Sequence, residues 1–176
     1  MLAAAIACGV LIGCSGSPAG PLQPVRTVNS FGLPVERGRV FSFVFWHRSE
    51  VAVTATLRGV SLHDPDAGLE LVDSGIARDE LQDPFYSSFP PAALTPLAGA
   101  MVTVVPGDRA SDVTFVLGLR ATGNLDALAA RGVWLDYEVS GRRYRVALPW
   151  LLRVCIEPVI GPCESQEPSQ FSFSPD

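Results

Sequence analysis

The sequence predicts an all-β fold, a two-sheet antiparallel sandwich of about seven or eight strands. Over much of the chain, apolar residues recur at every second position, which is the period of a strand with one buried face. Segments rich in Gly, Pro and Asp separate these runs, as turns between strands do. One pair of runs is joined by Ser140-Gly141, a two-residue link typical of a β-hairpin.

The expected strands differ in how many of their faces are apolar. Phe41–Trp46 is apolar on both faces, which predicts a central strand or one whose outer face is covered. Val51–Arg58 and Asp112–Thr122 alternate, so each should bury one face. Asn124–Ala130 predicts one helical turn capped by Asn124. The remaining strands are expected at Arg39–His47, Leu69–Ala77, Met101–Val105 and Trp150–Ile156.

The Ser140-Gly141 turn sets the register of its two strands. Counting outward gives core-side pairs Tyr137/Tyr144, Leu135/Val146 and Val133/Leu148, and solvent-side pairs Glu138/Arg143 and Asp136/Arg145. A slip of one residue would bury the charges, so this register is expected to be firm. Trp134 then lies on the solvent face opposite Ala147.

A long proline-rich loop over Asp79–Ala100 carries Phe85, Tyr86 and Phe89. Loops of this length inside compact domains are often functional. Aromatic side chains are enriched at interface hot spots, so these three rings and Trp134 are the candidate partner-binding residues. The alternative is that the loop rings fold back and plug one end of the sandwich.

The chain begins with an apolar run, Met1–Gly13, that is too short to span a bilayer, which needs about 20 residues. It is typical of the apolar region of a secretory signal. Its end, Leu11-Ile12-Gly13-Cys14, resembles the lipobox of bacterial lipoproteins. The resemblance implies removal of residues 1–13, a diacylglycerol on Cys14, and an extracytoplasmic protein anchored to a bacterial membrane.

The rest of the chain divides into three parts. Residues 14–24 are expected to form a lipidated, flexible Ser/Gly/Pro tether, residues 25–163 the sandwich domain, and residues 164–176 a flexible polar tail. The strand layout over Val25–Ile156 resembles immunoglobulin-like domains on bacterial surfaces. This likeness is architectural, so it implies a fold and no function.

Two cysteines, Cys155 and Cys163, remain after the signal and the lipidated residue are set aside. Disulfides persist in exported proteins, and Gly161-Pro162 allows the necessary bend, so we expect the two to be bonded. The metal alternative is poor, because two thiolates without a nearby His make half a site.

Composition and motifs narrow the functional classes. A net charge of −5 argues against nucleic-acid binding. No G-x-S-x-G elbow or phosphate-binding loop occurs in the sequence. We therefore expect a non-catalytic binding or accessory module of an envelope complex, without a cofactor or metal.

Two alternatives from other classes stay open. One is an exported metal-binding protein, with copper held by His47, His63 and Met101, or with calcium held by the turn that contains Asp64, Asp66 and Glu70. The other is an unrecognised hydrolase that uses one of the two histidines as its base.

Overall fold

The computed structural model describes residues 20–22, 29–47, 51–77, 81–108, 112–157 and 163. In these ranges the fold is all-β, as predicted, and no helix that could span a membrane is found there. The described strands are β1 (Asn29–Val35), β2 (Val40–His47), β3 (Val53–His63), β4 (Leu69–Ala77), β5 (Phe85–Tyr86), β6 (Leu94–Pro96), β7 (Met101–Val104), β8 (Val113–Ala121), β9 (Ala127–Ala130), β10 (Gly132–Val139), β11 (Arg142–Leu148) and β12 (Trp150–Ile156).

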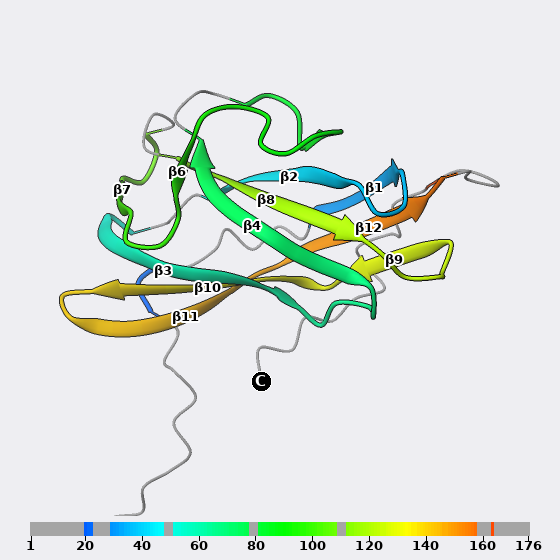
Figure 1. Ribbon diagram of the computed structural model, residues 1–176. Coiled ribbons are helices and arrows are strands. Elements are labelled where there is room, and N and C mark those ends of the chain that lie inside the picture. Colours follow the sequence, from blue (N-terminus) through cyan, green and yellow to red (C-terminus); the bar gives the residue numbers. More distant parts are fainter. Residues whose placement is uncertain are drawn as a thin grey trace, which may run out of the picture.

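The strands form two facing layers, with β2, β8 and β4 above β3, β10 and β11 in Figure 1. The upper layer is one sheet in the order β5-β2-β8-β4-β6. The lower layer consists of a four-stranded sheet, β11-β10-β3-β7, and a three-stranded sheet, β1-β12-β9, in which β1 runs parallel to β12. The β-sandwich prediction is therefore confirmed, and the immunoglobulin-like resemblance stays a prediction.

The two lower sheets share one long, bent hairpin. β9 and β10 are separated only by Arg131, and β11 and β12 only by Pro149. A proline cannot donate to a strand ladder, which explains the break between β11 and β12. This division, together with the short strands β5, β6 and β9, is why the described residues contain twelve strands and not seven or eight.

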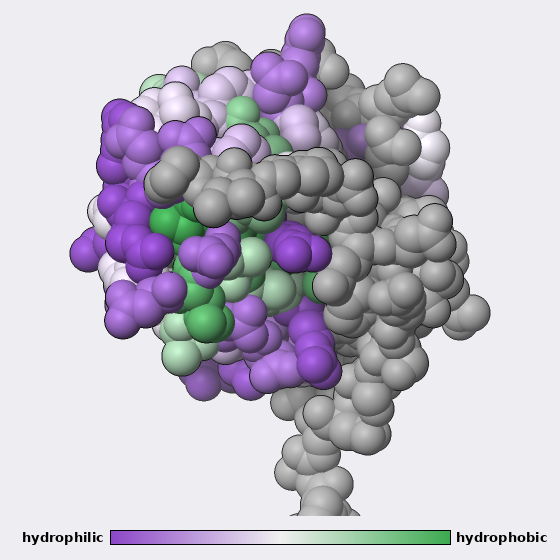
Figure 2. Space-filling model, turned by 90° about the vertical axis from the view of Figure 1, so that its right-hand side faces the viewer, coloured by the Kyte–Doolittle hydropathy of each residue, from purple (hydrophilic) through white to green (hydrophobic). Residues whose placement is uncertain are grey.

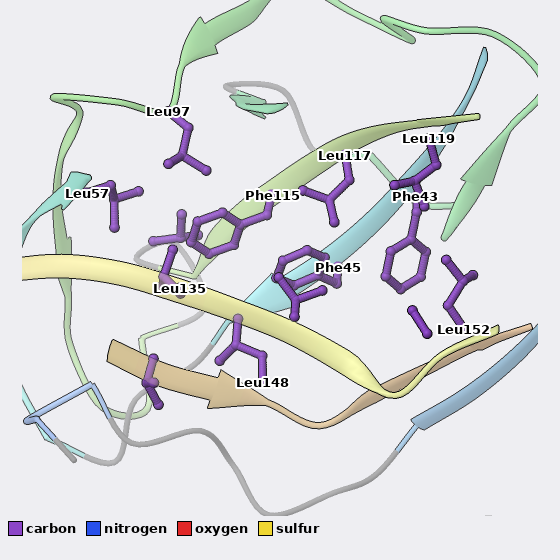
Figure 3. Close-up of a cluster of buried hydrophobic side chains, with 14 of the residues drawn as sticks. Phe43, Phe45, Leu57, Leu97, Phe115, Leu117, Leu119, Leu135, Leu148 and Leu152 are labelled. Atoms are coloured by element: carbon purple, nitrogen blue, oxygen red, sulfur yellow. The ribbon is translucent and has the colours of Figure 1, made fainter. Parts of the chain in front are cut away.

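The main core lies between the layers and is built from the inward faces of both (Figure 3). Phe45 and Phe115 stack with ring centroids 5.0 Å apart in the upper layer. Leu135 and Leu148 come from the lower layer, and both are fully buried. The inward apolar side chains of β8 therefore pack against those of β10 across the sandwich.

The β10–β11 hairpin has the predicted register, from Val139 opposite Arg142 to Val133 opposite Leu148. Tyr137 and Tyr144 stack at 5.5 Å on the core side. One solvent-side ion pair differs from the prediction, because Glu138 binds Arg58 of β3 at 2.7 Å.

The helical turn predicted at Asn124–Ala130 is wrong. Ala127–Ala130 forms β9, which pairs with β12 from Cys155 opposite Ala127 to Leu152 opposite Ala130. Leu128 and Ala130 are buried in the main core. Tertiary pairing with β12 therefore overrides the weak local preference for a helical cap.

The structure also changes two expected boundaries. The region Asp79–Ala100 is not wholly irregular, because it contains β5 and β6. Leu22 is 1% exposed and belongs to the main core, so the packed domain extends before Val25 into the expected tether.

Cys155 and Cys163 are joined by a disulfide, with the sulfur atoms 2.07 Å apart. The bond connects the end of β12 to residue 163. The lipobox, Cys14 and residues 164–176 lie outside the described residues.

Candidate functional site

The two sheets of the sandwich have very different outer faces. On the five-stranded sheet, the outward side chains of Val44 and Val116 are 0% exposed. They form a second apolar cluster with Ala77 and Leu81, against which Tyr86, Phe89, Ala92 and Leu94 pack. We call residues 81–96 the covering segment and this side of the sheet the covered face. Figure 1 shows the segment arching over β2, β8 and β4.

The covering segment approaches the sheet closely because two glycines lie under it. A Cβ atom on Gly118 would lie 2.8 Å from the Phe89 ring, and one on Gly75 would lie 2.9 Å from the Cβ of Leu94. The Ser42 hydroxyl donates to the Ser88 carbonyl at 2.6 Å, which adds a polar attachment. The apolar side chains on the outer side of β2 are therefore covered by the chain's own residues 81–96.

The structure divides the three predicted loop aromatics between the two sides of this sheet. Phe85 packs against Phe43 of the main core, with ring centroids 5.4 Å apart, whereas Tyr86 and Phe89 pack on the second cluster. All three are partly buried. Tyr86 and Phe89 therefore cover the outer face of the sheet, whereas Phe85, on the edge strand β5, packs on the core side. Their role in partner binding stays a prediction.

The outer face of the four-stranded sheet, which we call the open face, carries Trp134 near the start of β10. The Trp134 ring meets His63 edge-on at 4.9 Å, and the Arg145 guanidinium lies 5.8 Å from the ring centroid. Arg145 also binds Asp136 through two contacts of 2.7 and 3.0 Å, and this carboxylate raises the pKa of Arg145. Trp134 is thus held between a ring and a cation on neighbouring strands.

The open face extends across β3 to β7. Thr54 and Thr103 share a hydrogen bond of 2.9 Å, and Arg58 binds Glu138. Met101 on β7 is 75% exposed. Trp, Met and Arg are enriched at protein interfaces, so the composition suits a contact surface. Met101 was predicted only as a copper ligand, although the alternation in Met101–Val105 already places its side chain on the solvent side of the strand.

The end of the sandwich at the right of Figure 1 is seen directly in Figure 2, where hydrophilic side chains surround a limited hydrophobic area. Leu125, in the link between β8 and β9, is 57% exposed. Scattered exposed apolar residues are ordinary on soluble domains. Within the described ranges, the exposed large hydrophobic residues are Val51, Val72, Met101, Val105 and Leu125.

The candidate copper ligands do not converge. His47 ends β2 near the start of β3, and His63 ends β3. Because β3 has 11 residues, its ends are separated by about 33 Å at the usual rise of a strand. Among the residues that the structure describes, no group of three or more His, Cys, Asp or Glu side chains could hold a metal ion.

The carboxylates of the candidate calcium turn form hydrogen bonds and an ion pair with other parts of the protein. Asp66 accepts a hydrogen bond from the Ala129 amide at 2.8 Å, and Asp64 binds Arg131 at 3.2 Å. Glu70 accepts from the Thr122 hydroxyl at 3.4 Å. These contacts fasten the β3–β4 turn to neighbouring segments and do not point the oxygens at a common centre.

His47 has the surroundings of a core residue. It is 4% exposed, and its Nε2 has no hydrogen-bond partner among the described residues. Burial lowers its pKa to about 4, partly opposed by the charge of Asp112. A general base must reach a substrate proton, which this placement does not favour. His63 packs against Trp134 on the open face.

Models of protein families and curated proteins were both compared with this chain, and neither comparison finds a match. The fold and its two sheet faces define a β-sandwich domain with one covered and one open surface.

Proposed function

We propose that this protein is a non-catalytic, lipid-anchored lipoprotein of the bacterial cell envelope, whose sandwich binds a partner protein as an accessory module. The lipobox supports the location, and the open face supports the binding role. The single observation that carries the binding proposal is Trp134, a large aromatic side chain held on a sheet face whose other outward side chains are mostly charged or polar.

The location is supported by three features at both ends of the chain. Met1–Gly13 has the length and apolar character of a signal, and Cys14 ends it in a lipobox pattern. Cys155 and Cys163 are bonded, and structural disulfides persist in oxidising compartments outside the cytoplasm.

The open face suits a protein partner because its large side chains are already ordered. His63 and Arg145 restrict Trp134, and Asp136 restricts Arg145. A side chain that is ordered before binding loses less entropy when the complex forms. The exposed Met101 adds an adaptable apolar contact on the same face.

Anchoring is tested by fractionating cells that express the full chain and by mass spectrometry of its N-terminal peptide. The wild-type protein should be in the membrane fraction with a diacylglycerol-modified Cys14 at its N-terminus. The Cys14→Ser variant should lose both the modification and the membrane association. An unmodified Cys14 in the wild-type protein would refute the anchoring.

Binding is tested by crosslinking in intact cells followed by purification. Trp134→Ser with Met101→Ser should remove the partner, whereas the control Val72→Ser changes an exposed apolar residue of β4 and should not. Tyr86→Ser tests the covering segment in the same assay. Full capture of the partner by the Trp134/Met101 variant, with an unchanged melting temperature, would eliminate the open face as the contact.

A further inference from the structure

Residues Gly20–Leu22, which we call the N-terminal segment, are packed on the sandwich. The Leu22 side chain is 1% exposed, and its amide donates to the Tyr137 hydroxyl at 3.1 Å. A Cβ atom on Gly20 would lie 2.5 Å from the Tyr144 ring, so only glycine allows this approach. The chain is therefore held at a definite place shortly after the candidate lipidation site.

That place is close to the turn of the β10–β11 hairpin. Tyr137 and Tyr144 face each other three residue pairs from Ser140-Gly141. This spacing corresponds to about 10 Å along the strands. Figure 1 shows the N-terminal segment, in blue, beside β10 and β11 near their hairpin end. The opposite end of the sandwich, with the β3–β4 turn, lies farther away by most of the length of β3.

The spacer between lipid and domain is short. From Cys14 to Gly20 the chain makes six residue steps. A fully extended chain covers at most about 3.6 Å per residue, so the spacer reaches no more than about 22 Å. An acylated Cys14 lies at the level of the lipid headgroups, which keeps Gly20 within that distance of them.

The hairpin end also carries two exposed arginines, Arg142 and Arg143. Both lie beside the turn, and neither forms an ion pair within the described part of the chain. Glu138 is opposite Arg143 in the register, but its carboxylate binds Arg58 at 2.7 Å. Arg142 lies 5.8 Å from the centroid of the Tyr144 ring, and among the described residues neither guanidinium group has an acidic partner, so both are suited to phosphate oxygens.

We propose that the packed N-terminal segment orients the sandwich on the membrane, with the β10–β11 hairpin end facing the bilayer and Arg142 and Arg143 contacting phospholipid phosphates. The inference rests on the proposed lipid anchor. It adds an orientation in which the open face stands beside the membrane, accessible from the side to a neighbouring envelope protein.

The test measures how close each end of the full lipidated protein lies to the bilayer. Ser140→Cys at the hairpin turn and Asn124→Cys at the opposite end each receive a fluorophore. The proteins are reconstituted into vesicles of phosphatidylcholine and phosphatidylglycerol that contain a headgroup-attached quencher. The label at residue 140 should be quenched several-fold more strongly than the label at residue 124.

Two further variants separate the contribution of the short spacer from that of Arg142 and Arg143. A flexible Gly/Ser insertion between Ala19 and Gly20, equal in length to the natural spacer, should reduce the difference without altering the fold. Arg142→Glu with Arg143→Glu should also reduce it, whereas the control Arg39→Glu with Arg131→Glu, at the opposite end, should not. Equal quenching of both labels in the wild-type protein would overturn the orientation alone. Absence of lipid on Cys14 would overturn the anchor and the orientation together.

Discussion

The covered face and the open face belong to the same sandwich, yet the first is shielded from solvent by residues 81–96 and the second is in contact with solvent. On the covered face, Val44 and Val116 are 0% exposed beneath residues 81–96. On the open face, the corresponding outward positions carry Trp134, Asp136 and Glu138. The difference shows that a sheet needs a second cover where both faces of its strands are apolar, and none where they alternate.

The strongest test of this contrast is a charge placed on each face. Val44→Asp would bury an unpaired carboxylate under the covering segment and should cost about 4 kcal/mol or more. Ala147→Asp, opposite Trp134 on the open face, should cost less than about 1 kcal/mol. Urea unfolding of both variants gives the comparison. Similar losses for the two variants would mean that the covering segment does not exclude water.

The buried His47 should make the stability of the protein depend on pH. The pKa of His47 is lowered to about 4 in the folded protein, from 6.5 in its unperturbed state. Its neutral form is favoured by folding, so stability is complete above pH 6.5 and decreases as the pH falls toward 4. The shift corresponds to about 3 kcal/mol.

The measurement is the free energy of unfolding of the wild type and of His47→Leu between pH 7 and pH 4. The variant should lose most of the pH dependence in this window. A slope that is unchanged in His47→Leu would assign the acid sensitivity to other groups, and would remove His47 from the explanation.

Aromatic truncation compares the packing on the two faces. Phe89→Ala should cost about 2 kcal/mol, because Phe89 fills the space above Gly118 and only part of its ring is exposed. Trp134→Ala should cost about 1 kcal/mol, the scale of an exposed cation–π contact and its surrounding area. Thermal and chemical unfolding check the order. A larger loss for Trp134→Ala would reverse the comparison.

The smallest effect is expected from the ion pair of the open face. Arg145→Gln should cost about 0.5–1 kcal/mol at low salt, because Arg145 and Asp136 are both partly solvated. The cost should shrink in 1 M NaCl, where the screening length is about 3 Å. A double-mutant cycle with Asp136→Asn isolates the pair. A coupling that does not change with salt would indicate a buried interaction.

The β10–β11 hairpin shows what could be predicted from sequence. Its turn and its alternating pattern are both local, so each paired residue from Val133 to Leu148 was assigned correctly. The placement of the partly buried Trp134 on the solvent side of the sheet followed from the same register. The Asp136–Arg145 pair was also predicted, since both residues belong to this hairpin.

Other features depended on distant segments. Arg58, not Arg143, binds Glu138 because β3 joins β10 with a register shift between Asp136 and Tyr137. β9 was predicted as a helical turn because no local signal indicates that Ala127–Ala130 pairs with the distant strand β12. Leu22 lies in a proline-rich stretch that is typical of a spacer, and its hydrogen bond is made 115 residues away, to Tyr137.

The sequence by itself determined the strand character of the chain, the inward and outward faces of the hairpin, and the bonding of Cys155 to Cys163, because period-two alternation, a two-residue turn and a short Cys spacing act over a few residues. Only the tertiary structure decided which face is covered, where Leu22 is fixed and which arginine binds Glu138. Those outcomes depend on the packing of segments that are far apart in the chain, where burial of apolar area outweighs local preference.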